Sequence, residues 1–492
     1  MDYLSNYFEK VKKEKRSKKA IAFFASLDSV NEVYPQVAED ILKELKDQRA
    51  YLKLIASENF SSLATQLSMG NLLTDKYSEG YVKHRFYAGC ENVDNIEQLA
   101  IDEAKKLFNA DHVYVQPHSG SDANLVALWS ILVQKVQNKE VEKLSKKNAM
   151  ELTKEEYEKI RQLLVNQKLL GMSLNSGGHL THGYRLNISS KFMRSYTYDV
   201  DPKTHLLDYK KLETQVKEVK PLILLAGYSA YSRKLNFAKL KEIASTVGAV
   251  LMVDMAHFAG LVAGKVFTKD FNPIPFADVV TSTTHKTLRG PRGGLILCKD
   301  EYKETIDRGC PLVLGGPMPN VMAAKAVAFK EANTKDFQDY SSQVVKNAKA
   351  LANQLMENGI KILTDGTENH LIVMDVFSSF KLTGRQAETA LRSSGITVNR
   401  NSIPEDQNGP WYTSGIRLGT PALTTLGMKE NEMKRVADVI YDVLKNSKAA
   451  INPKTNGPSK AKSDIDPSVL TENQNEIKNL LDNFILYPEL VL

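Results

Sequence analysis

The stretch that decides the fold spans residues 279–294 and reads VVTSTTHKTLRGPRGG. Its apolar start predicts a buried strand, which runs directly into hydroxyl side chains, His285, Lys286 and a glycine-rich turn. A pocketed lysine loses its proton more readily, because desolvation disfavours the ammonium, and it can then form a Schiff base with an aldehyde cofactor. The hydroxyls and His285 suit a phosphate. On spacing alone, a solvated lysine after a strand stays open as the alternative.

Short apolar runs bounded by turn residues also occur at 222–227, 249–253 and 294–298, and an amphipathic stretch lies at 237–247. Short apolar strands that alternate with helices indicate a mostly parallel sheet that is covered on both faces. The sequence therefore predicts an α/β fold for the central part of the chain.

The pattern changes near residue 344. The elements predicted from there on are a helix at 344–357, strands at 361–363 and 371–376, and helices at 384–394 and 430–447. This order predicts a smaller α+β domain behind the larger α/β domain. We expect an N-terminal arm at 1–60, a large domain at 61–330 and a small C-terminal domain at 331–492.

Two segments look inserted. Residues 133–170 are rich in Lys and Glu, and the sequence from Thr153 to Glu156 is a capping-box pattern that predicts the start of a helix. Residues 450–473 contain three prolines among Lys, Ser and Asn. That composition predicts a flexible linker ahead of a last helix at 475–485.

The composition excludes several classes of protein. The chain has 492 residues, of which 42% are hydrophobic and 25% charged, so it is not collagen-like, wholly disordered or a disulfide scaffold. Cys90, Cys298 and Cys310 are too scattered for a disulfide framework or a zinc site, and they fit a cytoplasmic protein. We see neither a membrane span nor a secretory signal. The net charge of +7 is modest and, even with the basic run at 10–19, does not indicate nucleic-acid binding.

A second candidate element is the apolar run that ends in Asp254, with His257 three residues further on. An acid at the carboxyl end of a strand lies where ligands bind in open α/β sheets. Such a carboxylate can keep a pyridine nitrogen protonated, which makes the ring a stronger electron sink. A helix cap and a metal pair with His257 are the alternatives, although no third metal ligand is evident.

Two loops carry further candidate binding groups. Residues 116–124 read QPHSGSDAN, which predicts a helix N-terminus whose backbone N–H groups and two hydroxyls form a cup for a phosphate. A routine helix cap is the alternative. Residues 175–183 read NSGGHLTHG, where a histidine either lies flat on a ring or belongs to an ordinary loop.

Together with LIASENF at 54–60 and TSGIRLGTP at 413–421, these motifs resemble the serine hydroxymethyltransferase family. The resemblance covers most of the chain outside the two inserted segments and the extreme termini. The THKT core at 284–287, with the GPRGG run that follows, is specific to this family. The resemblance implies an aspartate-aminotransferase-like fold (fold type I), pyridoxal 5′-phosphate as cofactor, tetrahydrofolate as co-substrate and no metal.

The resemblance also implies a role for each matching residue. Lys286 would hold the cofactor as a Schiff base, Asp254 would pair with the pyridinium nitrogen, and His179 would stack on the ring. Ser229 and His257 would lie near the 3-oxygen of the cofactor. The residues implied to hold the phosphate are Ser119, Gly120, Ser121, His285 and, from a second subunit, Gly316.

On the substrate side, Arg417 would clamp the carboxylate of the amino acid in a bidentate pair, beside Ser57. Residues 77–87 match a segment that the family donates across a dimer interface, so Tyr77, Glu79 and Tyr87 would serve the neighbouring site. Glu79 is the candidate for proton transfer at the substrate hydroxyl or at the folate. The implied catalytic set is Lys286, Glu79, Asp254, His285 and Tyr87. The implied folate-binding residues are Leu174, Gly178, His179, Leu180, Asn401, Gly409, Pro410 and Trp411.

The sequence departs from the family pattern at three places. Asp122 stands where the family has Gln, Ser176 stands where it has His, and residues 310–317 lack the usual Gly-Gly-Gln run. An ionised Asp122 close to a phosphate would repel it. The insert at 133–170 enters just before the folate-side loop, where a surface elaboration, folate entry and a docking surface are the alternatives.

We therefore expect a homodimer, with a tetramer as the alternative, that interconverts L-serine and glycine while it passes a one-carbon unit to tetrahydrofolate. A folate-independent aldolase with the same retro-aldol chemistry is the nearest rival. A non-catalytic protein that binds RNA through its basic arm is the rival from another class. The presence of Lys286, Asp254 and Arg417 weighs against that second rival.

Overall fold

The computed structural model describes residues 2–453 and 456–492, and its largest sheet has seven strands in the order β4-β10-β9-β8-β7-β5-β6. These strands are β4 (His112–Tyr114), β5 (Lys168–Met172), β6 (Arg194–Tyr198), β7 (Ile223–Gly227), β8 (Val250–Asp254), β9 (Val279–Thr283) and β10 (Gly294–Cys298). Neighbouring strands are parallel except where β10 pairs with β4 and with β9. The predicted α/β class and the mostly parallel sheet are confirmed.

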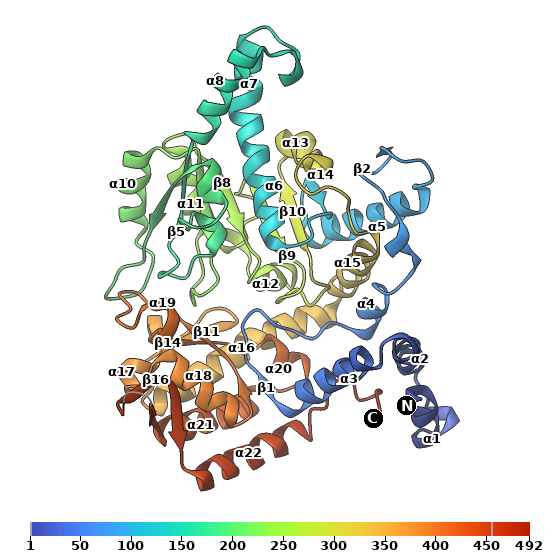
Figure 1. Cartoon of the computed structure of the whole chain (residues 1–492). Coiled ribbons are helices and arrows are strands. Elements are labelled where there is room, and N and C mark those ends of the chain that lie inside the picture. The colour runs from blue at the N-terminus through green and yellow to red at the C-terminus, as the bar shows by residue number, and fades with distance from the viewer. Residues whose placement is uncertain (1, 454–455) are drawn as a thin grey trace.

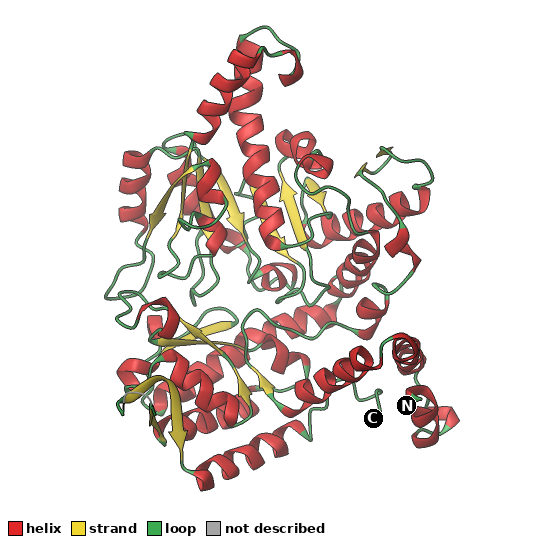
Figure 2. Cartoon of the chain, viewed as in Figure 1, coloured by secondary structure: helices red, strands yellow, loops and turns green. Residues whose placement is uncertain are grey.

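Helices lie on both faces of this sheet (Figure 2). Every residue of β7, β8, β9 and β10 is buried, as their continuous apolar runs predict. Successive side chains of a strand point to opposite faces. Ile223 and Leu225 therefore share an apolar cluster with α6 (Gly120–Leu132), whereas Leu224 shares the larger cluster with α11 (Phe237–Ser245).

A second, smaller sheet follows, with three antiparallel strands in the order β11-β14-β13. Its strands are β11 (Leu371–Asp375), β13 (Asn399–Asn401) and β14 (Gly415–Gly419), and the main helices around it are α16 (Lys335–Glu357), α18 (Gly384–Ser393) and α21 (Glu430–Lys445). These elements share one apolar core. Helix α16 begins well before the predicted residue 344, because Thr334 caps it.

The predicted strand at 361–363 is wrong. Only Ile362 makes a bridge there, to Met374, and a short turn at Leu363–Asp365 follows. Thr364 and Asp365 have φ angles of 62° and 51°, and this left-handed backbone cannot continue a strand.

The N-terminal segment packs against the C-terminal end of the chain, and the two termini lie near each other (Figure 1). Its helices are α1 (Tyr3–Lys10), α2 (Lys18–Val33) and α3 (Pro35–Ala50). Strand β1 (Leu52–Lys53) pairs in parallel with β12 (Ile396–Thr397), so the end of this segment joins the core around the smaller sheet. No helix in the described part of the chain combines the length and the apolar character that crossing a membrane requires.

The first insert forms a helical hairpin of α7 (Asn138–Lys143) and α8 (Lys154–Val165) that projects away from the sheet (Figure 1). The capping box at its second helix is confirmed: Thr153 Oγ1 accepts from the backbone N–H of Glu156 at 3.2 Å, and Glu156 Oε2 accepts from the N–H of Thr153 at 2.8 Å. The predicted end of the insert at residue 170 is wrong, because β5 lies inside the sheet between β7 and β6.

The linker prediction at 450–473 is also wrong, apart from residues 454–455, which lie outside the described residues. Strands β15 (Ser447–Ile451) and β16 (Pro458–Ile465) form an antiparallel hairpin, and α22 (Pro467–Leu481) starts and ends before the predicted 475–485. Pro458 opens a strand and Pro467 occupies the first turn of a helix, two positions at which the missing N–H costs little. Pro458 and Pro467 therefore mark element boundaries.

Candidate active site

A cavity of about 740 Å³ opens at the carboxyl ends of β8 and β9, and side chains from both sheets line it. It brings together most of the sequence-predicted residues: Ser57, Ser119, Gly120, Ser121, Leu174, Gly178, His179, Leu180, Ser229, Asp254, His257, His285, Lys286, Asn401, Pro410 and Arg417. It does not bring in Tyr77, Glu79, Tyr87, Gly316, Gly409 or Trp411. Gly409 lines a neighbouring cavity of about 1190 Å³, which shares Leu174, His179 and Pro410 with the first.

Asp254 ends β8, and three partners hold its carboxylate. His182 Nε2 lies 3.2 Å from Oδ2, Asn124 Nδ2 donates to Oδ2 at 2.9 Å, and the backbone N–H of Ala256 donates to Oδ1 at 2.9 Å. Burial alone would raise the pKa of Asp254, but the hydrogen bond to His182 and the nearby positive charges outweigh it and hold that pKa below its usual range. The carboxylate of Asp254 is therefore ionised at neutral pH, which is the form that could pair with a protonated ring nitrogen.

Lys286 lies in the turn after β9 and lines the same cavity. Asn59 Nδ2 donates to the backbone carbonyl of Lys286 at 3.0 Å and fixes this turn. Burial lowers the pKa of Lys286 to about 8, although the charge of Asp254 opposes the shift. A substantial fraction of the amine is thus neutral in mildly alkaline solution, which is the form that attacks an aldehyde.

The helix N-terminus predicted at 119–121 is the start of α6, and Ser119, Gly120 and Ser121 line the cavity. Ser119 caps the helix, with its Oγ accepting from the backbone N–H of Asp122 at 3.1 Å. A Cβ at Gly120 would lie 2.6 Å from Thr283 Cγ2, so glycine lets the helix approach β9 closely. Asp122, the departure expected to repel a phosphate, is not among the residues that line the cavity.

His285 supplies a direct test of whether this cup fits a phosphate. Its Nδ1 is buried and has no hydrogen-bond partner within the part of the chain that the structure describes. Burial lowers the pKa of His285 to about 3, so the ring is neutral and one of its nitrogens carries a proton. Hydroxyls, helix N–H groups, an imidazole and Arg292, which also lines the cavity, form a donor set that suits a phosphate.

Arg417 reaches the cavity from β14 of the smaller sheet. Its Nη1 donates to the backbone carbonyl of Ser229 at 2.7 Å and its Nε donates to Asn399 Oδ1 at 3.2 Å. Burial lowers the pKa of Arg417 to about 10, and the guanidinium still stays charged at neutral pH. His257 Nδ1 lies 3.3 Å from Nε2 of His370, which is a second contact between the two halves of the site.

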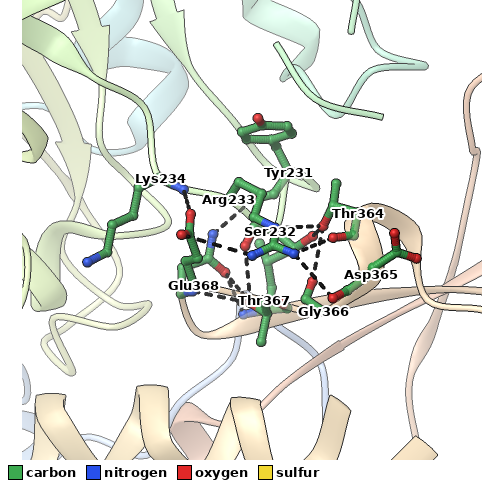
Figure 3. Close-up of polar contacts among 11 residues, drawn as sticks. Tyr231, Ser232, Arg233, Lys234, Thr364, Asp365, Gly366, Thr367 and Glu368 are labelled. Carbon is green, nitrogen blue, oxygen red and sulfur yellow. Dashed lines mark hydrogen bonds and ion pairs between the residues drawn. The ribbon is translucent and has the colours of Figure 1, made fainter. Parts of the chain in front are cut away.

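Figure 3 shows a third connection between the halves, centred on Arg233. Arg233 Nε donates to Thr364 Oγ1 at 3.2 Å, and its Nη2 donates to the backbone carbonyls of Thr364 and Asp365. The carbonyl of Ser232 accepts from the N–H of Glu368 at 2.9 Å. The loop that carries Ser229 is therefore fastened to the turn before β11, and the same loop accepts the hydrogen bond from Arg417.

Four predicted residues gather outside the cavity. The rings of Tyr77 and Tyr87 meet edge-on with centroids 5.1 Å apart, and Tyr87 Oη donates to Glu79 Oε2 at 3.3 Å. A Cβ at Gly316 would lie 3.1 Å from the ring of Tyr77. Tyr77 and Tyr87 are about half exposed. This cluster is assembled, but it does not contribute to the cavity of its own chain.

The sequence analysis missed several residues that support the site. Asn124 donates to Asp254 and also to Thr181 Oγ1 at 2.7 Å, and Thr181 Oγ1 lies 2.7 Å from His179 Nδ1. Asn124 lies in the stretch 116–124 and His182 in the stretch 175–183. Each is a polar side chain one or two helical turns beyond a binding motif, and that position is the sequence signal that could have identified it. Ser176, the second departure, is buried and fixes its loop by donating to Asp199 Oδ1 at 2.8 Å.

Ligand atoms of His179, His182 and Asp254 lie within 4.8 Å of one another, a spacing that a metal ion could use. This is a different set from the Asp254 and His257 pair that the sequence suggested. His182 and Asp254 are already paired with each other at 3.2 Å, and His179 Nδ1 is paired with Thr181 Oγ1 at 2.7 Å.

Comparisons with known proteins show which family this chain resembles. The family model for serine hydroxymethyltransferase matches residues 30–145 and 156–440. The chain is 55% identical over 470 residues to a serine hydroxymethyltransferase of Treponema pallidum, covering 96% of this chain and 82% of that protein. It is 53% identical to one of Cutibacterium acnes, with 96% of each chain covered, and 52% identical to one of Chlamydia trachomatis serovar D, with 100% and 98% covered.

The fold and the cavity define an α/β enzyme in which Lys286, Asp254 and the start of α6 line one cavity at the end of a mostly parallel sheet. The family match and the relatives narrow that class. The chain belongs to the serine hydroxymethyltransferase family.

Proposed function

We propose that this cavity is the active site for the family's reaction, with Lys286 as the residue that joins the cofactor. The chain is a pyridoxal-phosphate-dependent one-carbon transferase, and it converts L-serine and tetrahydrofolate reversibly to glycine and 5,10-methylenetetrahydrofolate. The observation that carries the assignment to this cavity is the joint presence of Lys286 and Asp254, the first with a lowered pKa and the second held ionised.

Each lining residue has a chemical task in this proposal. Pyridoxal phosphate, when bound, supplies an aldehyde for amines and a ring that accepts electrons. Lys286 offers the neutral amine, Asp254 holds a proton on the ring nitrogen, and His179 covers the ring face. Burial lowers the pKa of His179 to about 4, so this ring is neutral and packs without a charge to desolvate. The cup residues Ser119, Gly120, Ser121 and His285 hold the phosphate.

Arg417 and Ser57 bind the carboxylate of the amino acid in the proposal. The guanidinium already lies at the boundary between the two sheets, held by Ser229 and Asn399. Bidentate pairing to a carboxylate fixes the orientation of the substrate about its Cα, and so decides which bond lies in line with the ring orbitals. Ser229 and His257 lie beside the same space.

The folate-side residues line the outer part of the cavity and its neighbour: Leu174, Gly178, Leu180, Asn401, Gly409 and Pro410. Leu174 and Leu180 are exposed apolar side chains at the mouth, a chemistry that suits a flat aromatic ring system. Trp411 is exposed and lies under the guanidinium of Arg385, 5.0 Å from its ring centroid, so its contact with folate rests on the family resemblance alone.

We also propose a homodimer with shared active sites. Tyr77, Glu79, Tyr87 and Gly316 form one cluster away from the cavity. Phe86 is an exposed apolar residue within the segment 77–87, and Leu72 is another shortly before it. Exposed apolar groups on a folded segment are typical of an interface. Glu79 from the neighbouring subunit then moves the proton at the substrate hydroxyl or at the folate. A cytoplasmic location is supported by the three cysteines, all of them free and buried.

The folate-independent aldolase is tested by turnover of serine with and without tetrahydrofolate. A transferase cleaves serine at an appreciable rate only when folate is present. Comparable cleavage in its absence would favour the aldolase. The cavity residues at Leu174 and Asn401 favour the transferase, because they extend the site beyond what a small amino acid fills.

A further inference from the structure

Lys325 is a fully buried lysine that the proposed mechanism does not use. It lies on α15 (Pro319–Ala332), and its side chain is 1% exposed. Its Nζ donates to three backbone carbonyls, those of Val115 at 2.5 Å, Pro117 at 2.9 Å and Gly294 at 2.9 Å. Lysine is among the residues most rarely buried in full, so its position here needs a reason.

The three carbonyls belong to the segments that form the floor of the phosphate cup. Val115 follows β4, Pro117 stands two residues before Ser119, and Gly294 opens β10. The backbone N–H of Gly294 also donates to the carbonyl of Pro117 at 2.8 Å. Lys325 therefore completes a small hydrogen-bonded network directly behind the start of α6.

The backbone at Gly293 and Gly294 packs closely against its neighbours. A Cβ at Gly293 would lie 2.6 Å from Lys325 Cε, and a Cβ at Gly294 would lie 2.2 Å from the carbonyl oxygen of Ser119. Because neither glycine has a Cβ, the backbone at Gly293 can pack directly against the side chain of Lys325, and the backbone at Gly294 against Ser119.

The charge of this group is the second part of the observation. Three acceptors match the three N–H donors of an ammonium, whereas a neutral amine has only two. No carboxylate in the described residues forms an ion pair with Lys325. Burial lowers the pKa of Lys325 to about 7, although the distant charges of Glu97 and Asp122 oppose the shift. The amine is therefore only partly charged at neutral pH, and a nearby anion would favour the ammonium. A buried cation without a paired anion costs free energy, and a dianionic phosphate in the cup would offset that cost.

We propose that Lys325 is a positioning residue for the cofactor phosphate: its ammonium fixes the floor of the cup and places a positive charge behind it. The inference rests on the proposed function, because it assumes that the cup takes the phosphate of pyridoxal phosphate. Lys325 does not touch the phosphate. It acts through the backbone at Pro117 and Gly294 and through its charge.

The test compares two ligands on the cofactor-free protein, pyridoxal phosphate and pyridoxal, which lacks the phosphate. Lys325→Met keeps the length of the side chain and removes its charge and its donors. We expect affinity for pyridoxal phosphate to fall roughly tenfold or more, while affinity for pyridoxal changes by less than about threefold. The measurement is an absorbance titration of each ligand.

The matched control is Lys330→Met on the same helix. Lys330 is exposed and pairs with Glu103 at 2.9 Å, so both affinities should match those of the wild type. A thermal scan of the cofactor-free proteins with and without inorganic phosphate adds a readout without the aldehyde. The stabilisation by phosphate should disappear in Lys325→Met alone.

Equal losses for the two ligands would make Lys325 an ordinary structural residue and overturn the inference. If Lys325→Met does not fold, Lys325→Gln, which keeps two N–H donors, replaces it, and failure of both variants to fold would overturn the inference as well. A wild type that binds pyridoxal phosphate no better than pyridoxal would instead contradict the phosphate cup itself, and with it the proposed function.

Discussion

His182 Nε2 lies 3.2 Å from Asp254 Oδ2, inside the protein and behind the cavity that Lys286 lines. Asn124 Nδ2 donates to the same carboxylate oxygen at 2.9 Å. The carboxylate that would face the cofactor ring is thus supported from behind by two side chains that do not themselves need to touch the ring.

The first prediction concerns this carboxylate. Asp254→Asn removes the charge and leaves the size unchanged, so the side chain can no longer hold a proton on the ring nitrogen. We expect kcat for serine cleavage to fall by roughly a hundredfold or more. Steady-state kinetics at saturating cofactor measure the change, with circular dichroism as the check on folding. A variant that retains most of its turnover would exclude this role for Asp254.

The second prediction is a pH dependence. Because the pKa of Lys286 is lowered to about 8, the rate at which the cofactor-free protein joins pyridoxal phosphate should rise with a midpoint near that pH. Stopped-flow absorbance follows the reaction. In Asp254→Asn the midpoint should move lower, since the charge of Asp254 raises this pKa. A midpoint near the ordinary lysine value of 10.5 would contradict the burial argument.

The same group has a consequence for stability. Above pH 8 the folded protein has released this proton, while the unfolded chain keeps it up to about 10.5. The unfolded state then binds more protons, so the contribution of Lys286 to the free energy of unfolding rises as pH increases through that window. Comparison of wild type with Lys286→Met by denaturant unfolding at pH 7.5 and pH 10 isolates this contribution. A difference between the two proteins that is independent of pH would contradict it.

The third prediction separates recognition from chemistry. In Arg417→Lys the charge remains, but the planar fork that pairs with a carboxylate is lost. We expect a loss of roughly 2 kcal/mol in amino-acid binding, about thirtyfold in the KM for serine. Titration with glycine, followed by absorbance, reports the binding alone. If glycine binds to the variant as it does to the wild type, the carboxylate site lies elsewhere.

A fourth prediction addresses the contact in Figure 3. Arg233→Ala removes the hydrogen bonds to Thr364 and Asp365, which should lower the free energy of unfolding by about 1–3 kcal/mol. The substitution should also raise the KM for serine, because the loop that positions Ser229 against Arg417 loses its hydrogen bonds to the turn at Thr364 and Asp365. Lys239→Ala is the control: its pair with Glu242 is exposed, so its loss should leave the free energy of unfolding nearly unchanged. If the KM for serine is unchanged in Arg233→Ala, then Arg233 contributes to stability but does not position the substrate-binding loop.

The fifth prediction tests the shared active site. Lys286→Ala and Glu79→Gln should each be nearly inactive alone. If Glu79 serves the neighbouring subunit, subunits of the two variants that are mixed and re-associated form hybrid dimers with one intact site. Random pairing then restores about a quarter of wild-type activity. No recovery after verified subunit exchange would place Glu79 in the site of its own chain.

Much of the fold was predictable because it rests on local patterns. Continuous apolar runs such as 222–227 and 249–253 indicate strands that are buried on both faces, and the sheet contains both. The capping box at Thr153 needs only four neighbouring residues, and it forms as predicted. Residues at or just after the carboxyl end of a strand, such as Asp254 and Lys286, meet at one edge because parallel strands place their carboxyl ends together.

The misses depend on long-range contacts. The composition of 450–473, rich in Pro, Lys and Ser, is typical of a linker. However, Thr383, which caps α18, and Gln386 within that helix donate to the backbone of β16 and hold it in place. Residues 168–170 end a charged segment, yet tertiary pairing places β5 inside the sheet. The hydrogen bonds of His182 and Asn124 with Asp254, and those of Lys325 with the carbonyls behind α6, join residues that are far apart in the sequence. No local pattern shows which partners these side chains find.

The most direct test of the account is to load the purified protein with pyridoxal phosphate, reduce it with borohydride and map the modified peptide by mass spectrometry. We predict a single phosphopyridoxyl group on Lys286 and none on Lys325. Modification of a different lysine, or no modification in protein that has been exposed to excess cofactor, would contradict the central claim.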